Sequence, residues 1–203
     1  MKQTTREKVY AFIRRRLLAG PPPSVGEVRR EIDLQTLDSA RGHIDALVEE
    51  GRLEKPSASY RWLRLPASVD DRPEVMVPVM RPQRCGLPEL ELEEPFKFIP
   101  FRSRLSQKRL FGWKMIWEGM TDVDIMPGDY LVIRRQQEAK PGQIVAAYLG
   151  KEQLTIKTLK WRNKRWELHS ENRDYPTLIP TPLRPLTIVG LVLDVRQTLP
   201  KNG

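Results

Sequence analysis

The sequence predicts an α+β protein in which a helical N-terminal domain is joined to a mostly-β C-terminal domain. Helix-start signals and apolar residues at helical spacing fill the first 65 residues. Prolines then recur through residues 66–100, and from about residue 101 short apolar runs alternate with turn signals. At 203 residues the chain can bury one large core or two small ones, so two domains fit its length.

The first two helices are marked by their start signals. Thr4-x-x-Glu7 and Ser24-x-x-Glu27 both match the capping box, in which two side chains satisfy open backbone amides of a first helical turn. The first helix is expected to end at AGPPP, and the second to cover about residues 25–32. Four apolar residues at helical spacing give the first helix its buried face: Val9, Phe12, Ile13 and Leu17.

The third helix is expected to begin near Thr36 and to end at Gly51, because glycine readily adopts the left-handed conformation found at helix C-termini. Only a short connection separates it from the second helix, as in a helix-turn-helix. Its polar face suits insertion into a DNA major groove. Its apolar face is expected to bury Leu37, Ala40, Ile44, Leu47 and Val48.

The segment RLEKPSASYRWLRLP, residues 52–66, predicts two short strands around a Pro-Ser-Ala-Ser turn. With the three helices, this hairpin gives the order of a winged helix-turn-helix. A small dimerisation or protein-binding module would share that order, but basic residues on the hairpin favour DNA, because they would contact phosphates beside the base-reading helix. The expected DNA-binding residues are Thr36, Asp38, Ser39, Arg41, Gly42, Asp45, Lys55 and Arg61.

The composition narrows the possible partners. A net charge of +9 and a pI of about 9.8 favour a polyanion, most simply nucleic acid. One cysteine and two histidines exclude a disulfide framework and leave too few ligands for a zinc site, so no metal and no cofactor are expected. The chain has no apolar run of membrane-spanning length, and MKQTTREKV is not a signal peptide. We therefore expect a soluble, cytoplasmic protein with no membrane partner.

The rest of the chain divides into a linker and a β domain. Seven prolines in residues 66–100 predict an extended segment that is neither a continuous helix nor a central strand. The stretch KWRNKRW, basic with interleaved aromatics, is interpreted as a hairpin tip rather than a nucleic-acid platform. The expected domains are residues 1–66, 67–100 and 101–203. The expected strands are LFGWKMIW, YLVIR, QIVAAYL, QLTIKTL, RWELHS and TIVGLVLDV.

With both halves interpreted, the chain resembles the LexA-type repressors over nearly its full length. SVGEVRREIDLQTLDSARGHIDALVEEGRLE resembles the family's helix-turn-helix, and IMPGD before an apolar strand resembles the motif that follows its nucleophile. LTIKTL resembles the strand of the catalytic lysine, and ENRDYPTLIP followed by LTIVGLVLDV resembles its C-terminal part. The resemblance implies a winged helix followed by a mostly-β LexA and signal-peptidase-like domain, the serine–lysine self-cleaving peptidase shared with UmuD and phage repressors.

The resemblance also implies the site residues. The general base would be Lys157, whose apolar neighbours suit a lysine that must be neutral to activate a serine. The bond cut by the domain would be Cys85–Gly86. Aligned without gaps on IMPGD, the nucleophilic serine position holds Gly119, so the catalytic pair is incomplete. Thr121 could replace the serine only if this loop were two residues shorter than in the family. A natural loss and a deliberate replacement of the serine both fit the sequence.

In function, the resemblance implies a repressor of an SOS-like response to DNA damage. A homodimer, held together by the C-terminal domain with TIVGLVLDV as a candidate contact, would bind a two-fold symmetric operator. A RecA filament would stimulate self-cleavage. Arg41 and Gly42 replace residues that are acidic in familiar members, so a different operator is expected. Two alternatives stay open. One is an active self-cleaving or UmuD-like peptidase, and the other is a repressor released by a ligand or partner protein without cleavage.

Overall fold

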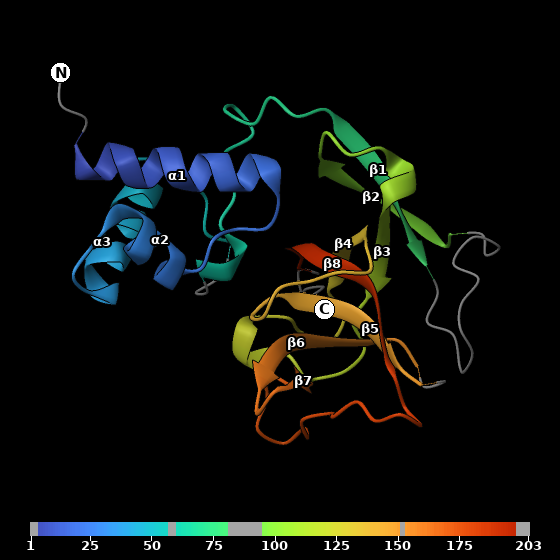
Figure 1. Cartoon of the computed structure of the whole chain (residues 1–203). Coiled ribbons are helices and arrows are strands. Elements are labelled where there is room, and N and C mark those ends of the chain that lie inside the picture. Colours follow the sequence, from blue (N-terminus) through green and yellow to red (C-terminus); the bar gives the residue numbers. More distant parts are fainter. Residues whose placement is uncertain (1–3, 57–59, 81–94, 151–152, 198–203) are drawn as a thin grey trace, which may run out of the picture. The chain divides into compact units, whose positions relative to one another are not determined.

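The computed structural model describes residues 4–56, 60–80, 95–150 and 153–197, and the chain divides into two compact units, Met1–Pro73 and Glu74–Gly203 (Figure 1). The first unit continues beyond residue 66 because Arg72 ties this segment to the first helix. Its guanidinium donates to the backbone oxygen of Leu17 at 2.8 Å and pairs with Asp70 at 2.7 Å. Pro73 is therefore the last residue of the helical unit.

Three helices form the first unit, close to the predicted bounds: α1 Thr5–Ala19, α2 Val25–Ile32 and α3 Leu37–Glu49. The Ser24 box is complete, with Ser24 and Glu27 each bonding the other's backbone amide. The capping box predicted at Thr4 is wrong in one of its two hydrogen bonds, the one from the Thr4 backbone amide to the Glu7 side chain. Thr4 accepts from the Glu7 amide at 3.2 Å, but the Glu7 carboxylate turns away to an arginine.

The core of this unit is the predicted apolar face of each helix together with Leu53, Leu63 and Leu65 from the segment that follows α3. Two predicted core positions differ. Leu37 is 44% exposed, and Val48 is only partly buried against the cluster. Leu37 is the first residue of α3 and faces outward there, because the three fully buried residues Ala40, Ile44 and Leu47 define a narrower apolar stripe.

The predicted hairpin after α3 is not formed as expected, and a wing is therefore not established. One isolated antiparallel bridge joins Glu54 to Arg64, and the expected second strand is instead a short 3₁₀-helix, η1, Tyr60–Trp62. The reason is tertiary. Trp62 is buried, and the Tyr60 hydroxyl donates to the Asp45 carboxylate of α3 at 2.6 Å, so this segment folds against α3 rather than extending as a ribbon.

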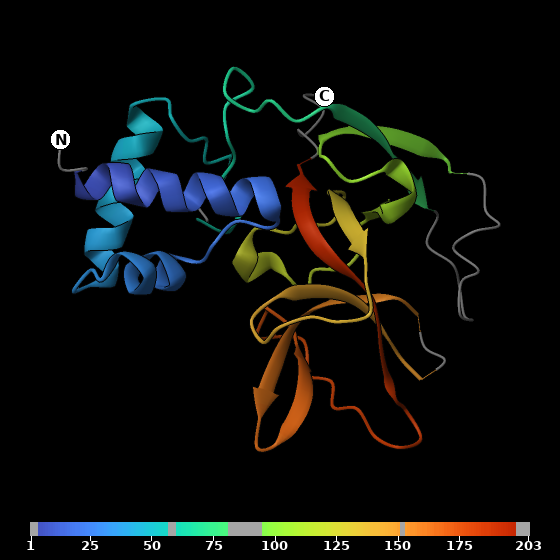
Figure 2. The ribbon, with the colours of Figure 1, turned by 45° about the horizontal axis from the view of Figure 1, so that its top comes forward.

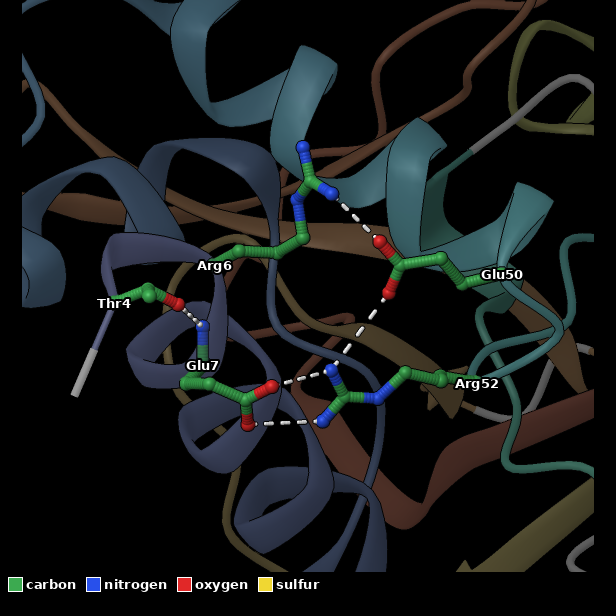
Figure 3. A network of polar contacts seen from close by, with 5 residues as sticks. All are labelled: Thr4, Arg6, Glu7, Glu50 and Arg52. Carbon is green, nitrogen blue, oxygen red and sulfur yellow. Dashed lines mark hydrogen bonds and ion pairs between the residues drawn. The ribbon is translucent and has the colours of Figure 1, made fainter. Parts of the chain in front are cut away.

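An ionic network fastens the start of α1 to the end of α3 (Figure 3). Arg52 forms two hydrogen bonds with the Glu7 carboxylate, at 2.7 and 3.0 Å, and lies over the Tyr10 ring at 3.9 Å. Arg6 pairs with Glu50 at 2.6 Å. The hydrogen bonds from Arg52 lower the pKa of the Glu7 carboxyl. The network explains why Glu7 leaves its capping position, since a bidentate arginine is the stronger partner.

The second unit is one eight-stranded sheet in the order β2-β1-β3-β4-β8-β5-β6-β7 (Figures 1 and 2). All neighbours are antiparallel except β1 and β3. Short 3₁₀-helices, η2 Gln107–Arg109 and η3 Thr121–Val123, precede β3 and β4. The strands are β1 Glu74–Met80, β2 Lys97–Arg102, β3 Leu110–Lys114, β4 Tyr130–Arg135, β5 Ile144–Leu149, β6 Thr155–Arg162, β7 Arg165–His169 and β8 Leu186–Arg196.

The proline-rich segment contributes two of these strands, so the expectation that it holds no central strand is wrong for β1. This strand lies between β2 and β3 and contains Pro78. Its ladder with β3 covers only Val79 and Met80, so the missing amide of Pro78 falls outside that pairing. Pro100 lies in β2, which is an edge strand. Both prolines therefore occupy positions that a sheet tolerates.

β8 is the long central strand that holds the sheet together, and in Figure 2 it is the red strand that bends along its length. Its register shifts twice, against β4 at Val132/Ile133 and against β5 at Ala146/Ala147. Such bulges bend a strand and raise its local twist. β8 pairs with β4 along residues 190–196 and with β5 along residues 186–191, so β5 does not cover the edge of its C-terminal half. The suggested dimer contact along TIVGLVLDV stays a prediction.

The basic aromatic stretch forms the predicted hairpin tip between β6 and β7. Asn163 and Lys164 both have positive φ, 50° and 60°, as a two-residue type I′ turn requires. Trp161 and Trp166 face each other across the hairpin with their ring centroids 4.9 Å apart. This edge-to-face pair stabilises the turn.

Two glycine-to-alanine changes are expected to act in opposite directions. A Cβ at Gly190 would lie 2.4 Å from Ile133 Cγ2 and 2.8 Å from a backbone oxygen, so Gly190→Ala should lower the free energy of unfolding by about 1–3 kcal/mol. A Cβ at Gly42, within α3, meets nothing within 4 Å, so Gly42→Ala should raise it by about 0.5–1 kcal/mol. Denaturant titrations followed by circular dichroism measure both. Equal effects would contradict the packing at β8.

Candidate functional site

The loop between β3 and β4 holds Gly119 in a fixed position. Met115 and Asp129 close the loop at its base through a 2.7 Å backbone hydrogen bond, and the Gly128 amide donates to the Met115 oxygen, also at 2.7 Å. Met120 and Ile125 are fully buried and anchor the middle of the loop. Gly128, with φ 99°, makes the turn of the IMPGD motif before β4 begins. Gly119 is therefore presented by an anchored loop.

Lys157 comes from β6 and points to the same place. Its side chain is buried, with the whole residue 8% exposed. A Cβ built on Gly119 would lie 3.0 Å from Lys157 Nζ and 3.6 Å from the ring of Tyr175. The Tyr175 ring centroid is 5.8 Å from the same amine. The structure thus brings Gly119 and Lys157 together, and a side chain at position 119 would begin in contact with the lysine amine.

A third element completes the surroundings, the segment of residues 170–176 that follows β7, here named the strap. Its backbone bonds to the loop twice, from the Glu171 amide to the Gly119 oxygen at 2.9 Å and from the Asp122 amide to the Glu171 oxygen at 2.8 Å. The Asn172 side-chain amide donates to the Glu118 oxygen, also at 2.8 Å. The strap therefore holds the backbone on both sides of Gly119.

The strap also supplies the polar partner of the lysine. Lys157 Nζ donates to the Ser170 hydroxyl at 2.7 Å. Among the described residues, no carboxylate pairs with Lys157. Burial lowers the pKa of the Lys157 amine, because removing an ammonium from water disfavours its charged form. The arrangement provides a buried amine with a raised neutral fraction beside the backbone of Gly119, which is what a general base requires.

Other candidate residues are placed differently. Thr121 lies at the start of η3, two residues beyond Gly119, and no described contact joins it to Lys157. Cys85 and Gly86 lie outside the described residues. Sequence reasoning missed Ser170 and Tyr175. Tyr175 lies inside the stretch ENRDYPTLIP, which carried part of the resemblance, but nothing in the sequence marks Ser170, the residue just before it, as a lysine partner.

The candidate DNA-binding residues form two groups. Thr36 caps α3 by accepting from the Ser39 amide at 3.0 Å, and the Arg41 guanidinium pairs with Asp38 at 2.7 Å. The first group is exposed on the first turns of α3: Thr36, Asp38, Ser39, Arg41 and Gly42.

The second group is engaged within the protein. Lys55 pairs with Asp45 at 2.9 Å and lies over the Tyr60 ring at 4.3 Å, while Arg61 is half-buried in η1. The hydrogen bond to Asp45 raises the pKa of the Lys55 amine. Asp45 and Lys55 therefore fasten the segment after α3 to the helix, a role that the sequence pattern did not indicate.

Comparison with known proteins shows the family of this chain. Residues 78–193 match the family described as Peptidase S24-like. The LexA repressor of Albidiferax ferrireducens is 30% identical, over 90% of this chain and 89% of that protein. The LexA repressor of Magnetococcus marinus is also 30% identical, over 95% and 87%. The chain belongs to the LexA repressor family. Its LexA-type relatives include that of Clostridium tetani, 28% identical over 96% of this chain and 97% of that protein.

Among the helices of the described ranges, none is long and apolar enough to cross a membrane. Within those same ranges, no group of three or more His, Cys, Asp or Glu side chains is placed to hold a metal ion.

The burial of Lys157 is predicted to lower the free energy of unfolding by an amount that depends on pH. The folded chain binds the lysine proton less tightly than the unfolded chain, whose amine titrates near 10.5. The unfolded state therefore binds more protons between the lowered pKa and 10.5, and stability rises with pH across that window. Lys157→Met should raise the melting temperature at pH 7, by roughly 2–4 °C for each kcal/mol of relieved cost. The gain should shrink toward pH 10.5.

Melting curves of both proteins, recorded from pH 7 to pH 10.5, measure this effect. Lys108→Met, at an exposed lysine of η2, serves as the control and should show no such convergence. A constant difference between Lys157→Met and the parent at every pH would contradict the burial of a titrating amine.

Proposed function

We propose that this protein is a sequence-specific DNA-binding repressor whose peptidase-like domain lacks its nucleophile and is inactive in the chain as given. The observation that carries the proposal is the position of Gly119. Its missing Cβ lies 3.0 Å from the amine of a buried lysine, in a chain that belongs to the LexA repressor family. Glycine offers no hydroxyl for Lys157 to activate, so the pair that would cut a peptide is incomplete.

Support for DNA binding comes from α2 and α3. A turn joins the two helices, and in it Asp33 has φ 57°. The polar side chains of the first turns of α3 are exposed to solvent. The Arg41–Asp38 pair is exposed, and such pairs contribute little to stability, so Arg41 can leave it at low cost. A guanidinium released there suits bidentate contact with guanine. The net charge of +9 favours a polyanionic partner in addition.

The proposal extends to assembly and control. Relatives named LexA repressor match over most of this chain, which supports a homodimer on a two-fold symmetric operator, with the second unit as the dimerising domain. A RecA filament is the proposed stimulus of cleavage in an SOS-like response, in forms of the protein that carry a nucleophile. With Gly119, the alternative of release by a ligand or partner protein without cleavage fits the same site.

The decisive experiment restores the hydroxyl. No positive φ is required at position 119, so a side chain fits its backbone, and its nearest contact is the flexible end of Lys157. Gly119→Ser should therefore cut the chain between Cys85 and Gly86, faster as rising pH deprotonates the buried lysine. Intact-mass measurement of the full chain over time, with and without RecA filaments, follows the reaction. Adding Lys157→Ala should slow it by at least about 100-fold.

The unmodified chain is the matched control and should keep its full mass throughout. Cleavage of the unmodified chain that is lost on Thr121→Ala would show that the nucleophile is Thr121. An uncut Gly119→Ser chain that still folds would show that more than the serine has been lost. Either result would refute the proposal that the missing serine at position 119 alone makes the site inactive. DNA binding is tested separately, by the Arg41 variant.

Arg41→Ala tests DNA recognition. If Arg41 contacts a base, the variant should lose about 1–3 kcal/mol of binding free energy on the specific site and much less on random duplex. Titrations at fixed salt measure both losses, with Arg109→Ala, an exposed arginine of η2, as the control that should change neither. Equal losses on the two duplexes would make Arg41 a phosphate contact and remove the claim of specificity.

A further inference from the structure

The partner of Lys157 is a serine that the family resemblance does not assign. Ser170 is the first residue after β7, 13 residues after Lys157, and accepts a hydrogen bond from the amine at 2.7 Å. The same hydroxyl donates its own hydrogen to the Pro176 oxygen at 3.1 Å. Ser170 is the first residue of the strap and Pro176 is the last. The hydrogen bond between them therefore holds the Ser170 hydroxyl in place.

The direction of these two bonds has a chemical consequence. A serine hydroxyl has one hydrogen, and here that hydrogen points to Pro176. The Ser170 oxygen can then offer only lone pairs to Lys157, so the amine must be the donor in the 2.7 Å bond. A neutral amine has two N–H groups and one lone pair. With one N–H bound to Ser170, the lone pair is directed away from Ser170 and remains open to a proton donor.

The other groups around the Lys157 amine show which way its lone pair can point. Gly119 lies on one side, with its missing Cβ 3.0 Å from Nζ, and the Tyr175 ring lies beside both. A hydroxyl carried by position 119 would be the proton donor nearest to that lone pair. We propose that Ser170 is a positioning residue, which turns the lone pair of Lys157 toward position 119 and is itself held by Pro176. This inference rests on the proposed role of Lys157 as general base.

The proposal predicts two changes that go in opposite directions. Without the acceptor of Ser170, the ammonium form loses a hydrogen bond, so the pKa of Lys157 should fall further and the rise of the cleavage rate with pH should move to lower pH. The same change leaves the lone pair unoriented, so the plateau rate at high pH should fall roughly ten-fold or more. Loss of local structure alone would lower the rate without moving the pH profile.

The test uses the full chain carrying Gly119→Ser, alone and with Ser170→Ala or Ser170→Thr. The alanine variant should show a lower plateau and a profile shifted to lower pH, and the threonine variant should restore both. Two controls come from neighbouring positions. Thr177→Ala removes a hydroxyl that contacts His169 rather than Lys157 and should change neither quantity. Asn172→Ala removes the strap's bond to Glu118 and should lower the plateau without a shift.

A second measurement does not depend on cleavage and separates failure of this inference from failure of the proposed function. In the unmodified Gly119 chain with ¹³C-labelled lysine, the ε-carbon signal of Lys157, assigned by its loss in Lys157→Met, reports the titration of the amine directly. Ser170→Ala should move that titration to lower pH, and Thr177→Ala should not. An unchanged titration would overturn the role of Ser170, even if Gly119→Ser cleaves. Cleavage of the unmodified chain that Ser170→Ala abolishes would also overturn it, by making Ser170 the nucleophile.

Discussion

The buried amine of Lys157 is the constraint around which the second unit is arranged. Burying an ammonium costs free energy unless other groups replace its water, and in this protein the described replacements are the Ser170 hydroxyl and the Tyr175 ring. Burial lowers the pKa of the lysine, and at a pH where the amine is neutral the cost of a buried charge is avoided. The loop of Gly119 precedes β6 in the sequence and the strap follows β7, and both contact the surroundings of that amine.

The bulged, bent β8 makes such closure possible. It joins the half of the sheet that carries the Gly119 loop, between β3 and β4, to the half that carries Lys157 on β6. The two register shifts let one strand serve both halves. Gly190 lies between these shifts, where a Cβ would collide with Ile133 and the Arg134 oxygen. Gly190 pairs with Ala146 of β5, and the neighbouring Val145 pairs with Lys157, so this tight packing lies two strands from the lysine.

The sequence predicted what is decided locally. Ser24 and Thr36 mark true helix starts, and six of the β segments are apolar runs bounded by turn signals, which can be recognised without tertiary information. It failed where distant residues compete. The Glu7 carboxylate bonds Arg52 instead of completing the capping box of α1. The Tyr60 hydroxyl bonds Asp45, and its segment forms a 3₁₀-helix instead of the second strand of a hairpin. Position 119 and Lys157 were found through the resemblance, whereas Ser170 was missed because a strand-terminal serine carries no local sign of a partner 13 residues away.

The Gly119 site raises the question of why a costly buried lysine persists beside a residue that cannot use it. A glycine at position 119 does not disturb the loop, because Met120, Ile125 and the strap hold the loop in place and no side chain at position 119 is needed. The backbone there needs no glycine, so the residue does not serve the fold. Removing the hydroxyl thus stops the proposed chemistry and leaves the scaffold intact. In the proposed function, the domain that joins two copies of the repressor on DNA requires no nucleophile, so this role is compatible with Gly119.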